Sequence, residues 1–129
     1  MNFKSGFKIG LSLQKEFLVL DEHAAAHIGS GSMKVLATPM MIAYLEITAR
    51  TLLDEYLPEG YSTVGTHVDI HHLAPTALGK TVRTKVVIKE IEDKKVLLDV
   101  TAWEGTRKIG EGIHERYVIE IERFLERIK

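Results

Sequence analysis

Three side chains in this sequence have the types and surroundings that acid–base or acyl-transfer chemistry requires: Thr38, Glu46 and His72. Glu46 lies in the middle of the apolar run 40–49. Because a buried carboxylate is costly unless it is paired or hydrogen-bonded, we expect Glu46 to have a partner or a function. A carboxylate, a hydroxyl and an imidazole around one cleft can together activate water or a nucleophile.

The helix that must position Thr38 and Glu46 is predicted over residues 37–57. Thr38 can serve as its N-cap, Pro39 fits the first helical position, and Pro58 ends it. Because this helix is apolar on nearly every face, we expect other structure to enclose it. As N-cap, Thr38 would lie at the positive end of the helix dipole, where backbone N–H groups can stabilise an oxyanion. Glu46 follows it by two turns, about 80° around the helix, so the two can flank one cleft.

The next strand must position His72. His71 and His72 are adjacent, so their side chains point to opposite faces of a strand. His72 shares its face with the apolar residues Val68 and Ile70, which makes it the inward histidine. A histidine in a sheet more often has a structural role than a catalytic one, and that alternative stays open. The sequence has no HExxH or similar motif, so it predicts no metal site.

His114 and Arg116 are a further pair of polar residues, on the last predicted strand. Their spacing of two residues places both side chains on the same face, because successive side chains of a strand alternate. Together they could bind an anionic group, but a solvated strand face is the favoured interpretation.

The rest of the chain mostly has the period of two that is typical of strands. The predicted elements are a strand or bent strand pair over 7–20, a short helical turn over 22–27, a loop over 29–32 that is either a lid or a plain connector, strands over 61–73, 81–91, 96–103 and 107–121, and a short amphipathic helix within 120–129. Four residues of the strand 61–73 are predicted to share one face: Val64, Thr66, Val68 and Ile70.

The order of these elements predicts the fold class. One strand, one long helix and four strands joined by short turns indicate an α+β fold, with a long antiparallel sheet wrapped around one central helix. One sheet covers such a helix incompletely, and a second copy of the chain would complete the cover. We therefore expect a homodimer.

Length and composition exclude several function classes. At 129 residues the chain is expected to form a single domain, residues 1–129. The formal net charge of -1 gives no footprint for nucleic acid or for a membrane surface, and the lack of cysteine excludes disulfides and thiolate chemistry. The N-terminus has no signal-peptide pattern, and no apolar run approaches the ~20 residues of a membrane span. The sequence therefore predicts a cytoplasmic protein.

Three motifs carry a resemblance to a known family. They are A-T-P-x-M-x-x-x-x-E in residues 37–46, V-G-T-x-V-x-I-x-H-L-A-P-T in residues 64–76 and I-G-E-G-x-H-E-R in residues 109–116. In this order and at these distances they resemble the hot-dog-fold thioesterases of the fluoroacetyl-CoA thioesterase type. That resemblance implies the same fold, a long sheet around a central helix in a dimer whose active site forms at the interface.

The resemblance also implies roles for single residues. The catalytic trio of the family falls on Thr38, Glu46 and His72, the glycine beside its acyl pocket on Gly65, and its substrate-binding arginine on Arg116. The fluoroacetyl-specific enzyme carries aromatic lid residues before the threonine. This chain has no aromatic residue in its segment 18–43, which favours a short acyl thioester in general over fluoroacetyl-CoA in particular.

As a mechanism we expect thioester hydrolysis without a cofactor or metal. Glu46 and His72 would form a hydrogen-bonded pair that activates water, or Glu46 would attack directly. Thr38 would orient the attacking group or act as the nucleophile. The thiol carrier is CoA or a carrier protein, and the assembly a homodimer or a tetramer.

Three alternatives to a thioesterase remain open at this point. The first is a hot-dog hydratase or dehydratase. The second is an acyl-CoA-binding or sensing module without turnover. The third is a structural dimer in which Glu46 pairs with Arg50.

Overall fold

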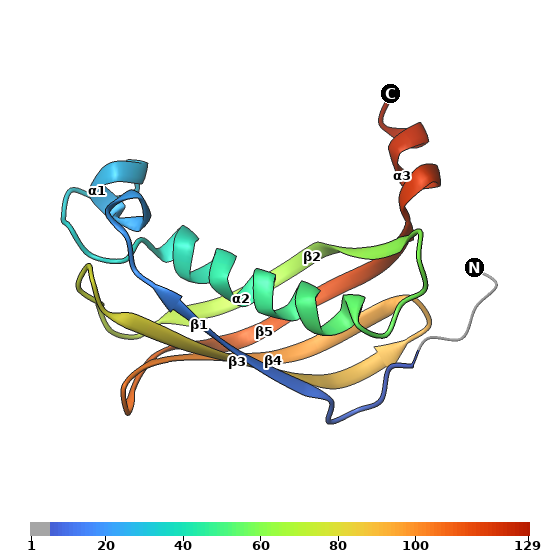
Figure 1. The fold of residues 1–129 in the computed structure, drawn as a ribbon, viewed down its shortest axis with the longest axis horizontal. Helices are drawn as coiled ribbons and strands as arrows, with labels where there is room; N and C mark the ends of the chain where they lie inside the picture. Colours follow the sequence, from blue (N-terminus) through green and yellow to red (C-terminus); the bar gives the residue numbers. More distant parts are fainter. Residues whose placement is uncertain (1–5) are drawn as a thin grey trace.

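The computed structural model describes residues 6–129, and a long helix lies across one face of a single sheet (Figure 1). The elements follow the predicted order of strand, helix and four further strands. They are β1 (Ser12–Leu18), η1 (Asp21–His23), α1 (Ala25–Ile28), α2 (Thr38–Asp54), β2 (Tyr61–His72), β3 (Thr81–Glu92), β4 (Lys95–Glu104), β5 (Arg107–Glu120) and α3 (Ile121–Arg127). Within the described part of the chain, no helix has the length and hydropathy needed to cross a membrane.

The sheet is antiparallel throughout, with the strand order β1-β3-β4-β5-β2. Tight turns make β3, β4 and β5 neighbours, because Asp93 (φ 55°) and Gly105 (φ 60°) adopt the left-handed backbone that short hairpin turns favour. β2 pairs with β5 along its length, so β1 and β2 form the two edges of the sheet. This arrangement brings the end of β2 beside the start of α2.

The core lies between α2 and the inner face of the sheet. Its helix residues recur at three- and four-residue spacings, and its strand residues alternate along β3 and β4. The core includes Met41, Tyr44, Leu45, Ala49, Leu52 and Leu53 from the helix and Val82, Val86, Ile88, Val96, Leu98 and Val100 from the strands. Each fully buried large side chain contributes roughly 1.5–3 kcal/mol, which holds the helix against the sheet.

Within this chain α2 is covered on one side, which corrects the expectation of a helix enclosed on nearly every face. The side chain of Glu46 is 42% exposed, and Ile47 is 44% exposed. The run of apolar residues did not distinguish the side that packs on the sheet from the side that a single chain leaves open.

The start of α2 also differs from the prediction. The N-cap is Ala37, which has an extended backbone, and Thr38 is the first helical residue. No side chain caps the helix; the Thr38 hydroxyl is hydrogen-bonded to His72 instead. Pro39 is therefore the second helical residue and not the first, and the helix ends at Asp54, one turn earlier than predicted.

A β-bulge in β2 overturns the prediction of one uniform alternation along this strand. The pairing with β5 shifts at Thr66, which has no paired residue there. Before the bulge Thr63 points to the inner face and is 5% exposed. After the bulge Ile70 packs against the core and His72 reaches the helix, so the inward parity has changed. Val64 therefore does not share a face with Ile70.

Candidate active site

The first residue of α2 and the last residue of β2 meet through their side chains. Thr38 Oγ1 lies 2.7 Å from His72 Nδ1. The other ring nitrogen, Nε2, is buried and makes no hydrogen bond of standard geometry with any described residue. Burial lowers the pKa of His72 below its ordinary value, and the nearby backbone of Ala74 opposes that shift. A neutral imidazole beside a hydroxyl can accept its proton, as a general base does.

A hollow of about 310 Å³ opens beside this pair. Thr38 and His72 line it, together with Ala25 from α1 and Ser30 from the loop that follows α1. The structure thus places the loop 29–32, predicted as a lid or a connector, at the edge of the hollow. The side chains that the loop and α1 contribute are small and carry no aromatic ring.

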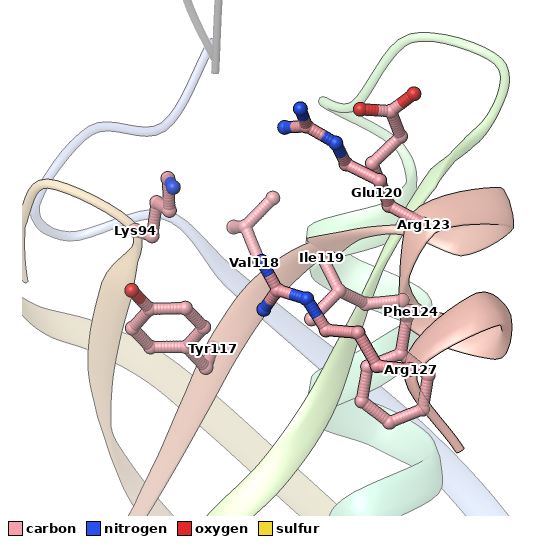
Figure 2. Close-up of a pocket in the computed structure, with 8 residues that line it drawn as sticks. All are labelled: Lys94, Tyr117, Val118, Ile119, Glu120, Arg123, Phe124 and Arg127. Atoms are coloured by element: carbon pink, nitrogen blue, oxygen red, sulfur yellow. The ribbon is translucent and has the colours of Figure 1, made fainter. Parts of the chain in front are cut away.

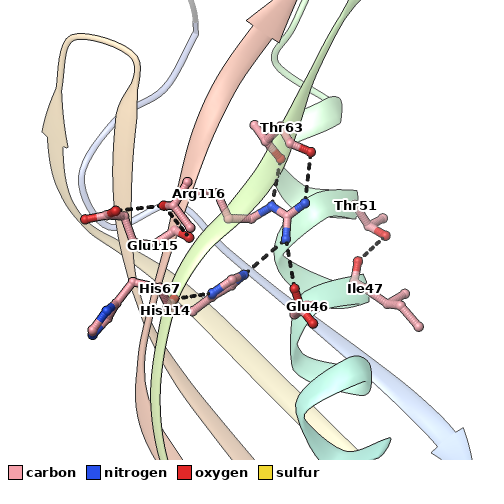
Figure 3. Close-up of polar contacts among 9 residues, drawn as sticks. Glu46, Ile47, Thr51, Thr63, His67, His114, Glu115 and Arg116 are labelled. Atoms are coloured by element: carbon pink, nitrogen blue, oxygen red, sulfur yellow. Dashed lines mark hydrogen bonds and ion pairs between the residues drawn. The ribbon is translucent and has the colours of Figure 1, made fainter. Parts of the chain in front are cut away.

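Glu46 lies about two turns further along α2 and is held by a different partner (Figure 3). Its Oε2 atom is 3.7 Å from Nη1 of Arg116 on β5. The expected hydrogen bond between Glu46 and His72 is not among those of the described residues, and about 12 Å of helix rise separates Glu46 from the start of α2. Glu46 does not pair with Arg50 either. Instead, Nε of Arg50 lies 3.5 Å from Oδ2 of Asp54.

Arg116 and His114 are both buried, with 5% and 1% of their surface exposed, so their interpretation as a solvated strand face is wrong. Arg116 donates from Nε to Thr63 Oγ1 (2.7 Å) and from Nη2 to the Thr63 carbonyl oxygen (2.9 Å). Its Nη1 lies 3.1 Å from Nε2 of His114 and also faces Glu46. The guanidinium thus has a defined orientation, with one N–H-bearing atom directed at the carboxylate.

Gly65 leaves room in front of Glu46. A Cβ atom at this position would lie 2.8 Å from Glu46 Oε2 and 3.2 Å from Cε1 of His114. A second hollow, of about 380 Å³, opens here, and its lining includes Glu46, Gly65, Val68 and His114. The missing side chain therefore creates space beside the carboxylate.

The structure brings the five predicted site residues together in two groups. Thr38 and His72 form one, and Glu46, Gly65 and Arg116 form the other. The sequence pointed to His114 only as a possible anion-binding partner of Arg116 and gave it no place among the site residues. Its shared face with Arg116 was a usable signal, but no pattern in the sequence shows that β5 lies opposite the carboxylate of α2.

Another cavity, of about 130 Å³, lies between β5 and α3 (Figure 2). It is basic, with Lys94, Arg123 and Arg127 in its lining, but it includes none of the predicted site residues. Across residues 6–129, no three His, Asp or Glu side chains are grouped so that they could hold a metal ion. The candidate active site is therefore the region between α2, β2 and β5.

The sequence pattern of the fluoroacetyl-CoA-specific thioesterases matches residues 19–122, which contain all five predicted site residues. The chain belongs to this family. The fluoroacetyl-CoA thioesterase of Streptantibioticus cattleyicolor is 28% identical over 132 residues, which cover 98% of this chain and 95% of that protein. The family is therefore one of thioester hydrolases, and the relative is a distant one.

Solved structures show the same hot-dog fold. A mutant of the fluoroacetyl-CoA-specific thioesterase superimposes with a TM-score of 0.90 at 27% identity, with 97% of each chain covered. A thioesterase superfamily member from Thermus thermophilus gives a TM-score of 0.84 at 25% identity, with 94% of this chain and 92% of the other covered. The same mutant of the fluoroacetyl-CoA-specific enzyme has also been solved in complex with fluoroacetate and CoA, and a different mutant of that enzyme in complex with acetyl-CoA.

Proposed function

We propose that this protein is an acyl-CoA thioesterase that hydrolyses a short acyl thioester, with Thr38, Glu46 and His72 as its catalytic residues. The observation that carries the proposal is the 2.7 Å hydrogen bond between the Thr38 hydroxyl and a neutral His72, at the start of α2. Membership of a thioester hydrolase family supports the reaction class, and the CoA complexes of the relative support the carrier.

In the proposed reaction the thioester carbonyl lies between the two groups of residues. Glu46 takes a proton from a water molecule, whose oxygen attacks the carbonyl carbon. The oxyanion forms at the start of α2, where Thr38 has the one first-turn N–H group without a hydrogen bond among the described residues: Pro39 has no N–H, and Met40 donates to the Ala37 carbonyl. The C–S bond then breaks, and the thiolate leaves as the thiol with the proton that Glu46 accepted.

Thr38 and His72 orient the attacking water in this scheme. If His72 Nδ1 accepts the Thr38 proton, the hydroxyl oxygen keeps its lone pairs and can accept a hydrogen bond from a water molecule in the hollow that Thr38 lines. Arg116 and Gly65 act on the other side, where they hold Glu46 and leave space beside it.

We also propose that the chain acts as a single domain that pairs into a homodimer. β2 is an edge strand, and the apolar side chains of Ile47 and Val68 near Glu46 are 44% and 43% exposed. A second copy that covers this side would remove both from water and enclose the half-exposed carboxylate. Light scattering coupled to gel filtration should give twice the mass of the chain; a monomer would contradict this.

The acyl group is proposed to be short but not restricted to fluoroacetyl. The hollow beside Thr38 receives Ala25 and Ser30 from the preceding segment, and both side chains are small. Neither side chain has an aromatic ring that could select one acyl group by contact.

The experiment that tests the function is thiol release from a panel of acyl-CoA thioesters, from acetyl to long-chain and aryl. Glu46→Gln removes the carboxylate charge and keeps its shape, and Glu55→Gln, an exposed position just past α2, is the matched control. We expect selective hydrolysis that Glu46→Gln abolishes and Glu55→Gln retains. Tight binding of a panel member without release would instead identify a non-hydrolytic acyl-CoA-binding or sensing module.

A further inference from the structure

His114 is a fully buried histidine that the proposed reaction does not use. We propose that it is a positioning residue: as a neutral ring with its proton on Nδ1, it directs Arg116 toward Glu46, and its protonation removes that alignment. This inference rests on the proposed function in so far as Glu46 acts in turnover.

Two hydrogen bonds require the same tautomer of His114 (Figure 3). Its Nδ1 lies 2.8 Å from the carbonyl oxygen of His67, which can only accept, so Nδ1 must carry a proton. Its Nε2 lies 3.1 Å from Nη1 of Arg116, and a guanidinium only donates, so Nε2 must present its lone pair. No other protonation state of the ring satisfies both partners.

The bond to Nε2 matters because it selects where Arg116 points. Two of the guanidinium nitrogens are bound to Thr63, through its hydroxyl and its carbonyl oxygen. The third, Nη1, is shared between His114 at 3.1 Å and Glu46 Oε2 at 3.7 Å. His114 is therefore the hydrogen-bond acceptor that keeps Nη1 on the side of the carboxylate.

His114 also connects this cluster to the bulge in β2. The His67 carbonyl that it binds follows Thr66, the residue without a pairing partner. Thr66 is in turn held by a hydrogen bond of 2.7 Å from its hydroxyl to Glu115 Oε2. The bulge is thus fixed through two consecutive residues of β5, and Gly65 just before it borders the hollow in front of Glu46.

The charged groups around His114 determine its response to pH. Burial is the main cause that lowers its pKa, and the Arg116 charge lowers it further. The His67 carbonyl on β2, Glu46 on α2 and Glu115 on β5 oppose that shift. On balance the pKa is lowered, so the neutral ring is the form present at neutral pH. Protonation in acid would place an N–H group against Nη1 of Arg116 and break their hydrogen bond.

A pair of amide substitutions separates the two bonds. Gln at position 114 can present its carbonyl oxygen near the place of Nε2, and Asn can present its amide N–H near the place of Nδ1. We expect His114→Gln to retain turnover of the panel's best acyl-CoA, and His114→Asn to lose at least about tenfold in kcat, as for the loss of one hydrogen bond to a charged group. Thermal unfolding of both variants shows whether the fold is kept.

The pH profile gives a readout that a purely structural residue would not change. Because Gln does not titrate, the acid limb of log(kcat/KM) in His114→Gln should be shallower than that of the unaltered protein by about one proton. Equal kcat values in the Asn and Gln variants, together with unchanged acid limbs, would overturn the proposal.

A measurement on the unaltered protein covers the case in which both variants fail to fold. The ¹⁵N shifts of the His114 ring at neutral pH should show a proton on Nδ1 and none on Nε2. A proton on Nε2 would overturn the proposal directly. If the unaltered protein releases no thiol from any thioester, the proposed function fails, while the ring tautomer still decides this inference.

Discussion

The two groups of site residues differ in how fully their polar atoms are bound. At the start of α2, the ring of His72 has one hydrogen bond of standard geometry, to Thr38, while its Nε2 has none among the described residues and only the backbone of Ala74 nearby. Midway along the helix, Arg116 has three hydrogen bonds and an ion pair, and both ring nitrogens of His114 are bound. The first group thus keeps a buried ring nitrogen without a standard hydrogen bond, whereas the second holds the Arg116 guanidinium in one orientation beside Glu46.

This difference suggests a division of labour within one reaction. A side chain that transfers protons must be able to change its protonation state. Hydrogen bonds to all of its polar atoms oppose such a change. A side chain that positions a carboxylate must instead keep one protonation state and one orientation. Within the second group, Glu46 is the member that exchanges a proton in the proposed reaction, because it is half-exposed and faces the hollow, while Arg116 and His114 hold it in place.

The largest expected effect comes from removing one member of each group. Glu46→Gln and His72→Gln should each lower kcat by about 10² to 10⁴, the usual contribution of acid–base catalysis. If both act in the same step, the double variant should be little worse than the poorer single variant. Single-turnover rates for the three variants measure this. Losses that multiply would show that the two groups work independently.

The hydroxyl of Thr38 should matter more than its methyl group. Thr38→Val keeps the shape but loses the bond to His72, and we expect kcat to fall by about 10². Thr38→Ser keeps the hydroxyl and should remain within about tenfold of the unaltered protein, with no acyl-enzyme burst if Thr38 only orients water. A burst in pre-steady-state thiol release would instead make Thr38 the nucleophile.

Gly65→Ala tests the space in front of Glu46. The new Cβ would lie 2.8 Å from Oε2, so the carboxylate must move away from its place beside Arg116. We expect kcat to fall by about tenfold or more, because a small misplacement of a catalytic group is costly. In the Glu46→Gln background the same change should add little. A further full loss there would place the effect of Gly65 elsewhere.

Stability should respond to acid through the two histidines of the site. Burial lowers the pKa of His72 and of His114 in the folded state. The unfolded chain, with histidine pKa values of about 6.5, therefore binds protons first, and the free energy of unfolding should fall as the pH drops below that value. Urea unfolding at a series of pH values measures the slope, which His114→Gln should reduce. A free energy of unfolding that stays constant or rises over this range would contradict the lowered values.

The smallest effects compare two threonines of β2, Thr63 before the bulge and Thr66 at the bulge. Thr63 is buried and accepts a hydrogen bond from Arg116, so Thr63→Val should cost about 1.5–3 kcal/mol of unfolding free energy. Thr66 is exposed and bonds Glu115 in solvent, so Thr66→Val should cost less than about 1 kcal/mol. Urea unfolding measures both free energies. Equal losses in the two variants would contradict the description of Thr63 as buried and Thr66 as exposed.

The sequence by itself determined the order of elements, the fold class and the family. Periodicity was enough to place one strand, the helix and four further strands, because the hydrophobic core imposes a spacing of two or of three to four residues on each element. The three motifs also named residues that adjoin in space, since Thr38 and His72 meet and Gly65, Glu46 and Arg116 lie beside one another. Patterns within a short stretch of sequence predict the features that this stretch itself determines, such as the type and order of the helices and strands.

Only the tertiary structure decided which of these groups touch. The Thr38 hydroxyl contacts His72 rather than capping α2, and Glu46 pairs with Arg116 rather than with His72 or Arg50. Each of these choices depends on how strands distant in sequence pair beneath the helix. The single-residue bulge at Thr66 changes the parity of β2 and leaves no mark in the pattern of apolar residues. The burial of His114 arises in the same way. Its ring is hydrogen-bonded to His67 on β2 and to Arg116 on β5.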